Sequence, residues 1–215
     1  MKKSVKLGLL SVAIIGVSAI FYFKYNLSRF KRQVVFQANA EADKWLPYDE
    51  LDAATAEIIK QYWSEGVGIN FTTEQILSAD FQNTWAWSAA FISWVIKASG
   101  GDTFPVHQTH AHYVMATTNN RTTNPQADFV AYSTTEIKPK KSDIVCKRRG
   151  NSDATYGDVT AGDTLHCDIV VDVNKDSIEV IGGNVDNKVK QSTLTLDSEG
   201  YLNEEDYFVI IQSKL

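Results

Sequence analysis

The chain has 215 residues, of which 44% are hydrophobic and 11% aromatic, so it can build one domain with a real core and is not globally disordered. Its charge is uneven. Residues 1–32 hold seven Lys or Arg and no acid, which leaves 21 − 7 = 14 bases against 26 acids, or −12, in the remainder. An acidic body argues against nucleic acid as a partner, because phosphates need a basic surface. The basic leader suits anionic lipid headgroups.

The leader, residues 1–32, contains an uncharged apolar run from Leu7 to Phe23, between Lys6 and Lys24. As a helix this run would span about 26 Å, and the flanking lysines can extend its reach to a hydrocarbon core of about 30 Å. We expect a single-pass inner-membrane anchor. The alternative is a signal peptide that is cleaved after the small residues at 17–19 and releases the protein. The apolar run favours the anchor because it continues to Phe23.

The remaining residues, 33–215, are predicted to form a single domain whose first half is helical. The spacing of apolar residues predicts an amphipathic helix over 27–45 and a second helix over 51–64, followed by a short helical turn from residue 72. An almost uncharged stretch near 87–98 predicts a buried central helix. Residues 102–126 are rich in Thr, Asn and His and are predicted to be mostly loop.

Strand patterns dominate the second half of the chain. They occur at 127–133, 143–148, 165–173, 177–182, 190–196 and 206–213. Helices followed by an antiparallel sheet of five to six strands indicate an α+β fold. Cys146 and Cys167 lie in these strands, and we interpret them as small buried hydrophobic residues. The alternative is a single disulfide outside the cytoplasm, if neighbouring strands bring the two together.

Ser88 is the first candidate for chemistry, because it begins the predicted buried helix. A helix N-terminus supplies free N–H groups and positive potential, which stabilise an anionic nucleophile or an oxyanion. Serine is also a common N-cap residue, and the turn by itself favours that simpler role.

A second candidate lies in the hairpin over 165–184. A three-residue turn near 174–176 would place His166 opposite Asn184, close enough for a hydrogen bond across the two strands. An asparagine at that position would orient the imidazole as a general base. A register shift of one residue would break this pairing.

Four ordered motifs carry a family resemblance: WSAAFISWV at 87–95, SDIVC at 142–146, HCDIV at 166–170 and IGGNV at 181–185. They resemble the bacterial family catalogued as domain of unknown function 2272, which in turn resembles the papain-like CHAP and NlpC-type amidases and peptidases. The resemblance implies a papain-like fold with Ser88 as nucleophile, His166 as base and Asn184 as the orienting residue. Those enzymes carry cysteine where this chain has Ser88. Serine is the weaker nucleophile and depends on its base, but Ser-His-Asn can still form an acyl-transfer triad.

Other residues have supporting roles in this interpretation. Asp168 is the rival orienting residue or an anchor for a substrate amine. His110 belongs to a run of three histidines, but no carboxylate or cysteine completes a zinc site. We therefore expect no metal or cofactor. The resemblance aligns His110 with a family histidine that precedes a Tyr-Val or Tyr-Ile pair, which implies that His110 lines the cleft. Trp87 is interpreted as core or cleft wall. Arg149 is either a solvated strand end or a clamp for a substrate carboxylate.

The predicted function is hydrolysis of an amide bond in peptidoglycan peptides by a Ser-His-Asn site. The resemblance to wall-directed enzymes implies that the domain faces the periplasm. Alternatives are a non-catalytic peptidoglycan-binding or scaffold domain of an envelope machine, and an esterase or acyltransferase. Related domains also serve as antibacterial effectors, so a secretion-system or immunity partner stays open.

Overall fold

The computed structural model describes residues 29–48, 50 and 52–215. The predicted anchor or signal segment, Leu7 to Phe23, lies outside the described residues. Within the described part, no helix is both long and apolar enough to cross a membrane.

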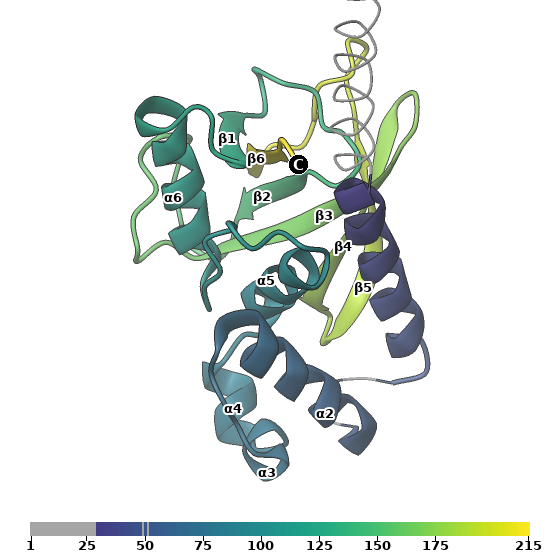
Figure 1. Cartoon of the computed structure of the whole chain (residues 1–215). Coiled ribbons are helices and arrows are strands. Elements are labelled where there is room, and N and C mark those ends of the chain that lie inside the picture. The colour runs from purple at the N-terminus through teal and green to yellow at the C-terminus, as the bar shows by residue number, and fades with distance from the viewer. Residues whose placement is uncertain (1–28, 49, 51) are drawn as a thin grey trace, which may run out of the picture.

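In this part of the chain, six strands form one antiparallel sheet in the order β1-β6-β2-β3-β4-β5 (Figure 1). Every strand end lies within three residues of the segment expected from the sequence, and the predicted α+β class with helices packed on an antiparallel sheet is confirmed. The strands are β1 (Phe129–Ser133), β2 (Ile144–Arg148), β3 (Leu165–Val173), β4 (Ser177–Val185), β5 (Lys188–Thr195) and β6 (Tyr207–Ser213).

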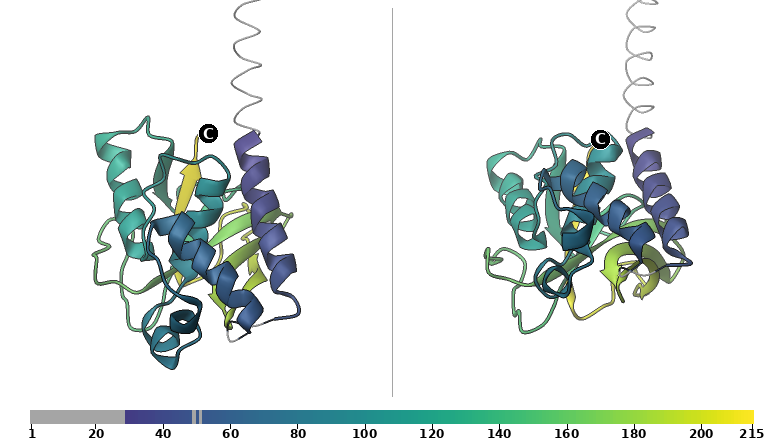
Figure 2. Two further views of the ribbon diagram at one scale, coloured as in Figure 1. Left: turned by 60° about the horizontal axis from the view of Figure 1, so that its bottom comes forward. Right: turned by 90° about the horizontal axis from the view of Figure 1, so that it is seen from below.

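Helices fill most of the first half. Residues 29–45 are helical, in agreement with the amphipathic pattern, and Phe30, Val34 and Ala38 are buried as that pattern predicts. Figure 2 shows this helix and α6 on opposite flanks of the domain. The other helices are α2 (Ala53–Gln61), the π-helix η1 (Tyr62–Val67), α3 (Thr73–Ile76), α4 (Ala79–Thr84), α5 (Ser88–Ala98) and α6 (His110–Thr123).

The buried central helix expected near 87–98 is α5, which packs between η1 and the strands β3 and β4. Gly66 lies inside η1, where a Cβ atom would come 2.8 Å from the carbonyl oxygen of Ala90. The two helices can approach this closely because Gly66 has no side chain. The sequence suggested that the helix ends before Gly66, but it continues as a π turn and ends at Gly68, whose φ is 79°.

The prediction of loop for residues 102–126 is wrong, because α6 occupies His110–Thr123. Thr, Asn and His are weak helix formers, and the buried face of this helix is itself partly polar. This face occupies positions 110, 113, 114 and 117, with the i, i+3, i+4, i+7 spacing of one helix side. These four side chains are buried, and α6 packs against β1. Burial in the tertiary structure, rather than local propensity, therefore stabilises this helix.

The core is strongly aromatic where α5 begins. Trp87 stacks on Trp45 with ring centroids 4.8 Å apart, and the ring of Tyr62 lies 5.9 Å from that of Trp87. The indole Nε1 of Trp87 donates to Glu50 Oε2 at 2.9 Å. Because Trp87 immediately precedes Ser88, these contacts fix the position of the first turn of α5.

Candidate active site

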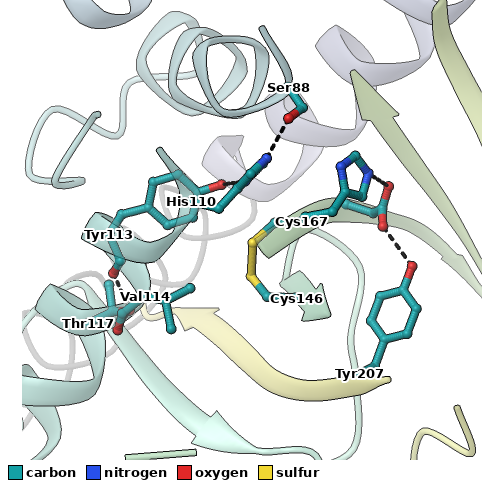
Figure 3. Close-up of a disulfide and its surroundings, with 10 residues drawn as sticks. Ser88, His110, Tyr113, Val114, Thr117, Cys146, Cys167 and Tyr207 are labelled. Carbon is teal, nitrogen blue, oxygen red and sulfur yellow. Dashed lines mark hydrogen bonds and ion pairs between the residues drawn. A yellow bond between two sulfur atoms is a disulfide. The ribbon is translucent and has the colours of Figure 1, made fainter. Parts of the chain in front are cut away.

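Ser88 is the first residue of α5, and its hydroxyl faces a histidine. Trp87 occupies the cap position and makes no capping hydrogen bond through its side chain. Ser88 Oγ lies 2.6 Å from His110 Nε2 (Figure 3). The interpretation of Ser88 as an N-cap is therefore wrong, since an imidazole engages its hydroxyl.

His110 reaches Ser88 from the first turn of α6. Its Nδ1 is hydrogen-bonded to the hydroxyl of Tyr113, so Ser88, His110 and Tyr113 form a continuous chain of polar groups (Figure 3). Burial lowers the pKa of His110 well below its usual value, and the charges of His166 and Arg149 lower it further. The imidazole is therefore neutral near pH 7, which is the form that can accept a proton.

His166 lies on β3 and is held by a carboxylate. Its Nε2 is 3.0 Å from Asp168 Oδ1, and Tyr207 donates its hydroxyl hydrogen to Asp168 Oδ2 at 2.8 Å. Burial by itself raises the pKa of Asp168, but the charge and hydrogen bond of His166, together with the Tyr207 bond, outweigh burial and hold that pKa below its usual value. Asp168 is therefore ionised and accepts the Nε2 hydrogen. His166 Nδ1 is buried and has no hydrogen-bond partner among the described residues.

The two histidines meet edge to face, with ring centroids 5.4 Å apart. Ser88, His110, His166 and Asp168 are each only 3–5% exposed. They come from α5, α6 and β3, so the fold gathers them into one buried polar cluster. A hydroxyl, two imidazoles and an ionised carboxylate are the groups that nucleophilic and acid–base catalysis use.

Asn184, the predicted orienting residue, does not hold His166. The β3–β4 turn is one residue longer than predicted, and a bulge in β3 compensates, so Ile169 pairs with Ile181 as expected. Asn184 then falls in a second irregularity, between β4 and β5, where its φ is 56°. The carboxylate of Asp168, the rival in the sequence interpretation, holds the imidazole instead.

The two cysteines lie opposite one another on β2 and β3 and form a disulfide, with Cα atoms 4.1 Å apart. The favoured interpretation of free buried thiols is therefore wrong, and the alternative of a single pair is confirmed. Cys167 lies between His166 and Asp168 in sequence. The disulfide thus ties β3 to β2 at the segment that carries the site.

These positions can be compared with known proteins. Residues 50–212 match a family described as an uncharacterized protein conserved in bacteria (DUF2272). The chain belongs to this family. No curated protein and no solved structure matches it. The DUF2272 region contains the whole polar cluster and all four motifs that suggested the family.

Two of the remaining predicted site residues of this DUF2272 domain differ in exposure. Trp87 is fully buried in the aromatic core, so its side chain does not line a surface cleft. Arg149 is exposed just after β2, and its charge reaches His110. Arg149 is thus close enough to act on the site electrostatically.

The other two histidines of the run do not join the site. The rings of His107 and His112 stack in parallel, 3.9 Å apart, so their nitrogens do not converge on one point. Across the described ranges, no group of three His, Cys, Asp or Glu residues is placed to hold a metal ion.

A cavity of about 910 Å³ lies along the other face of α6, between this helix and the loop that precedes β3. Arg121 is one of its lining residues and donates to both carboxylate oxygens of Glu136. Thr118 Oγ1 is buried there and has no partner in the described part of the chain. The lining residues are His112, Met115, Ala116, Thr118, Asn119, Arg121, Thr122, Glu136, Tyr156, Gly157 and Val159.

Proposed function

We propose that this protein is a serine hydrolase of the bacterial cell envelope that cleaves an amide bond in peptidoglycan peptides. The observation that carries the proposal is the 2.6 Å contact between Ser88 Oγ and His110 Nε2 at the first turn of a buried helix. A serine hydroxyl becomes a useful nucleophile when a neutral imidazole can take its proton. The free N–H groups of the helix start are suited to stabilise the oxyanion that forms when Ser88 attacks.

The reaction would proceed in two steps. Ser88 Oγ attacks the carbonyl carbon, its proton passes to an imidazole, and the amine leaves with a proton from the site. Water then attacks the acyl-enzyme, which releases the acid and restores the hydroxyl. This sequence needs no cofactor, because the chain supplies the nucleophile, the bases and the carboxylate.

The proposal includes a papain-like fold of the CHAP or NlpC type. A nucleophile at the start of a buried helix, packed on an antiparallel sheet with a strand histidine, is the arrangement expected of a papain-like CHAP or NlpC-type domain. The disulfide favours an oxidising compartment. With the basic apolar leader, this supports a single-pass inner-membrane protein whose domain faces the periplasm, or a secreted one if the leader is cleaved.

Digestion of purified muropeptides by the full-length chain, followed by mass spectrometry, tests the proposal. We expect products that have gained one water, with a new amine and a new carboxylate. The Ser88→Ala chain should yield none. Intact muropeptides after exhaustive digestion, with a chain shown to be folded, would reject hydrolysis of these bonds.

A second candidate is a non-catalytic peptidoglycan-binding domain. The cavity along α6 favours it, because its volume lies in the range of ligand sites, while the Ser88 cluster is almost fully buried. Cosedimentation with insoluble peptidoglycan, using a Met115→Glu chain, tests this role. Val173→Glu is the matched control, since Met115 and Val173 are 38% and 37% exposed and only Met115 lines the cavity. Loss of binding in Met115→Glu alone, without any cleavage of muropeptides, would favour the binding domain.

A further inference from the structure

Two histidines at one serine are more than a simple triad needs, and their surroundings differ. His110 is bonded through Nε2 to Ser88 and through Nδ1 to Tyr113, and neither partner is a carboxylate. His166 is bonded through Nε2 to the carboxylate of Asp168, and its Nδ1 is unpartnered among the described residues although the side chain is buried. One imidazole is therefore engaged with the nucleophile, and the other has a free nitrogen inside the site.

We propose that the two histidines divide the proton transfers, with His110 as the base for Ser88 and His166 as the acid for the leaving amine. This inference rests on the proposed hydrolase function and adds a catalytic residue to it. The sequence expectation, by contrast, made His166 the base.

The protons balance over the cycle. As Ser88 Oγ bonds to the carbonyl carbon, its proton moves to His110 Nε2. As the C–N bond breaks, His166 gives the proton on Nδ1 to the departing amine. In the second half the attacking water gives a proton to His166 Nδ1, and His110 returns its proton to Ser88 Oγ as the acyl group leaves. The net change is one amide and one water converted to one acid and one amine.

The charged groups around the two rings fit this division. His110 faces the charges of His166 on β3 and Arg149 beyond β2, which together with burial disfavour its protonated form. His166 faces the ionised Asp168, which is supported by Tyr207 on β6 and by the charge of Lys147 on β2. Because Asp168 holds Nε2, Nδ1 is the nitrogen of His166 that is left to exchange a proton within the site.

Gly182 on β4 leaves room for the His166–Asp168 pair. A Cβ atom at this position would lie 2.1 Å from Asp168 Oδ1 and 2.9 Å from His166 Nε2. The pair can pack against β4 because residue 182 has no side chain. His166 and Asp168 are therefore positioned by contacts from β3, β4 and β6.

The test replaces Ser88 by cysteine in the full-length chain and needs no substrate. Both native cysteines are in the disulfide, so Ser88→Cys introduces the only free thiol. The titration of this thiol is followed by thiolate absorbance, with the Ser88→Ala chain as blank, and by the pH dependence of its alkylation by iodoacetamide. A thiol beside a base at a helix start should ionise with a midpoint below pH 7, against about 8.5 for an ordinary cysteine.

Second substitutions then identify the partner. In the Ser88→Cys chain, His110→Gln should raise the midpoint by more than about one pH unit, which is a tenfold change in the ionisation constant. His166→Gln should leave the midpoint within about half a unit. His112→Gln is the matched control, because His112 lies on α6 and is exposed. Tyr113→Phe removes the partner of His110 Nδ1 without touching either histidine, and should raise the midpoint as well.

The opposite pattern, a midpoint that rises with His166→Gln and not with His110→Gln, would overturn the division of roles. Equal rises in the two variants would overturn it too. Because the titration involves no substrate, such a result leaves the muropeptide assay to decide whether the protein is a hydrolase. An active hydrolase with a His166-dependent thiol would fail only this inference.

Discussion

Asp143 should make the stability of this protein depend on pH in an unusual direction. It belongs to the SDIVC motif at the start of β2 and is 1% exposed. Its Oδ2 accepts the backbone N–H of Lys140 at 2.9 Å. Burial raises the pKa of Asp143 from 3.8 to about 7, against the opposing effects of this bond, of the Lys31 and Lys140 charges and of Gln212.

The sign follows from proton binding. Between pH 4 and 7 the folded Asp143 holds a proton that the unfolded one has lost, so raising the pH through this window lowers the free energy of unfolding. The stability that this bound proton contributes is fully present below the pKa of Asp143 in the unfolded chain. It is lost as the pH rises through about 7, the pKa in the folded chain. Three units of pKa correspond to about 4 kcal/mol.

The perturbation is Asp143→Asn, which keeps the acceptor for Lys140 and cannot ionise. We expect the variant to match the native chain near pH 4 and to exceed it by about 4 kcal/mol at pH 8.5. Urea unfolding at several pH values measures the difference, and other titrating groups cancel because both chains share them. Asp153→Asn, at an exposed position, should show no such trend. A native-minus-variant difference that is constant over pH 5–8.5, or that grows in the native chain's favour as pH rises, would refute the reasoning.

Three further changes test the site and its frame. Ser88→Ala should abolish turnover of muropeptides and lower the free energy of unfolding by only about 1 kcal/mol, the value of one lost hydrogen bond; unchanged turnover would remove Ser88 from the mechanism. Gly182→Ala should lower the free energy of unfolding by about 1–3 kcal/mol, because overpacking displaces the His166–Asp168 pair. Gly162→Ala is the control in the same thermal unfolding measurement. It should be nearly neutral, because the nearest atom to a Cβ at residue 162 is 3.9 Å away. Joint replacement of Cys146 and Cys167 by alanine should lower stability by about 3 kcal/mol, as expected for a loop closed over 21 residues. A thiol assay that finds free cysteine in the unfolded, unreduced native chain would contradict that prediction.

Strands and buried helices were predictable because their pattern is local. Alternating apolar residues placed β3 at 165–173, and the uncharged stretch near 87–98 identified α5. The α6 helix was missed because Thr and Asn are frequent in it and because its buried face includes the polar residues His110 and Thr117. With only Tyr113 and Val114 as larger apolar residues on that face, the helical period is weak in the sequence.

The sequence by itself determined the α+β class, the position of Ser88 at the start of a buried helix, and His166 on a strand beside a carboxylate. These follow from period and from residue type, which need no distant contact. Only the tertiary structure decided which side chains contact Ser88 and His166. The irregularity between β4 and β5 takes Asn184 out of the predicted pairing with His166, and the docking of α6 brings His110 to Ser88. Pairing between segments depends on register and packing, and a local irregularity in one strand is enough to change which side chains meet.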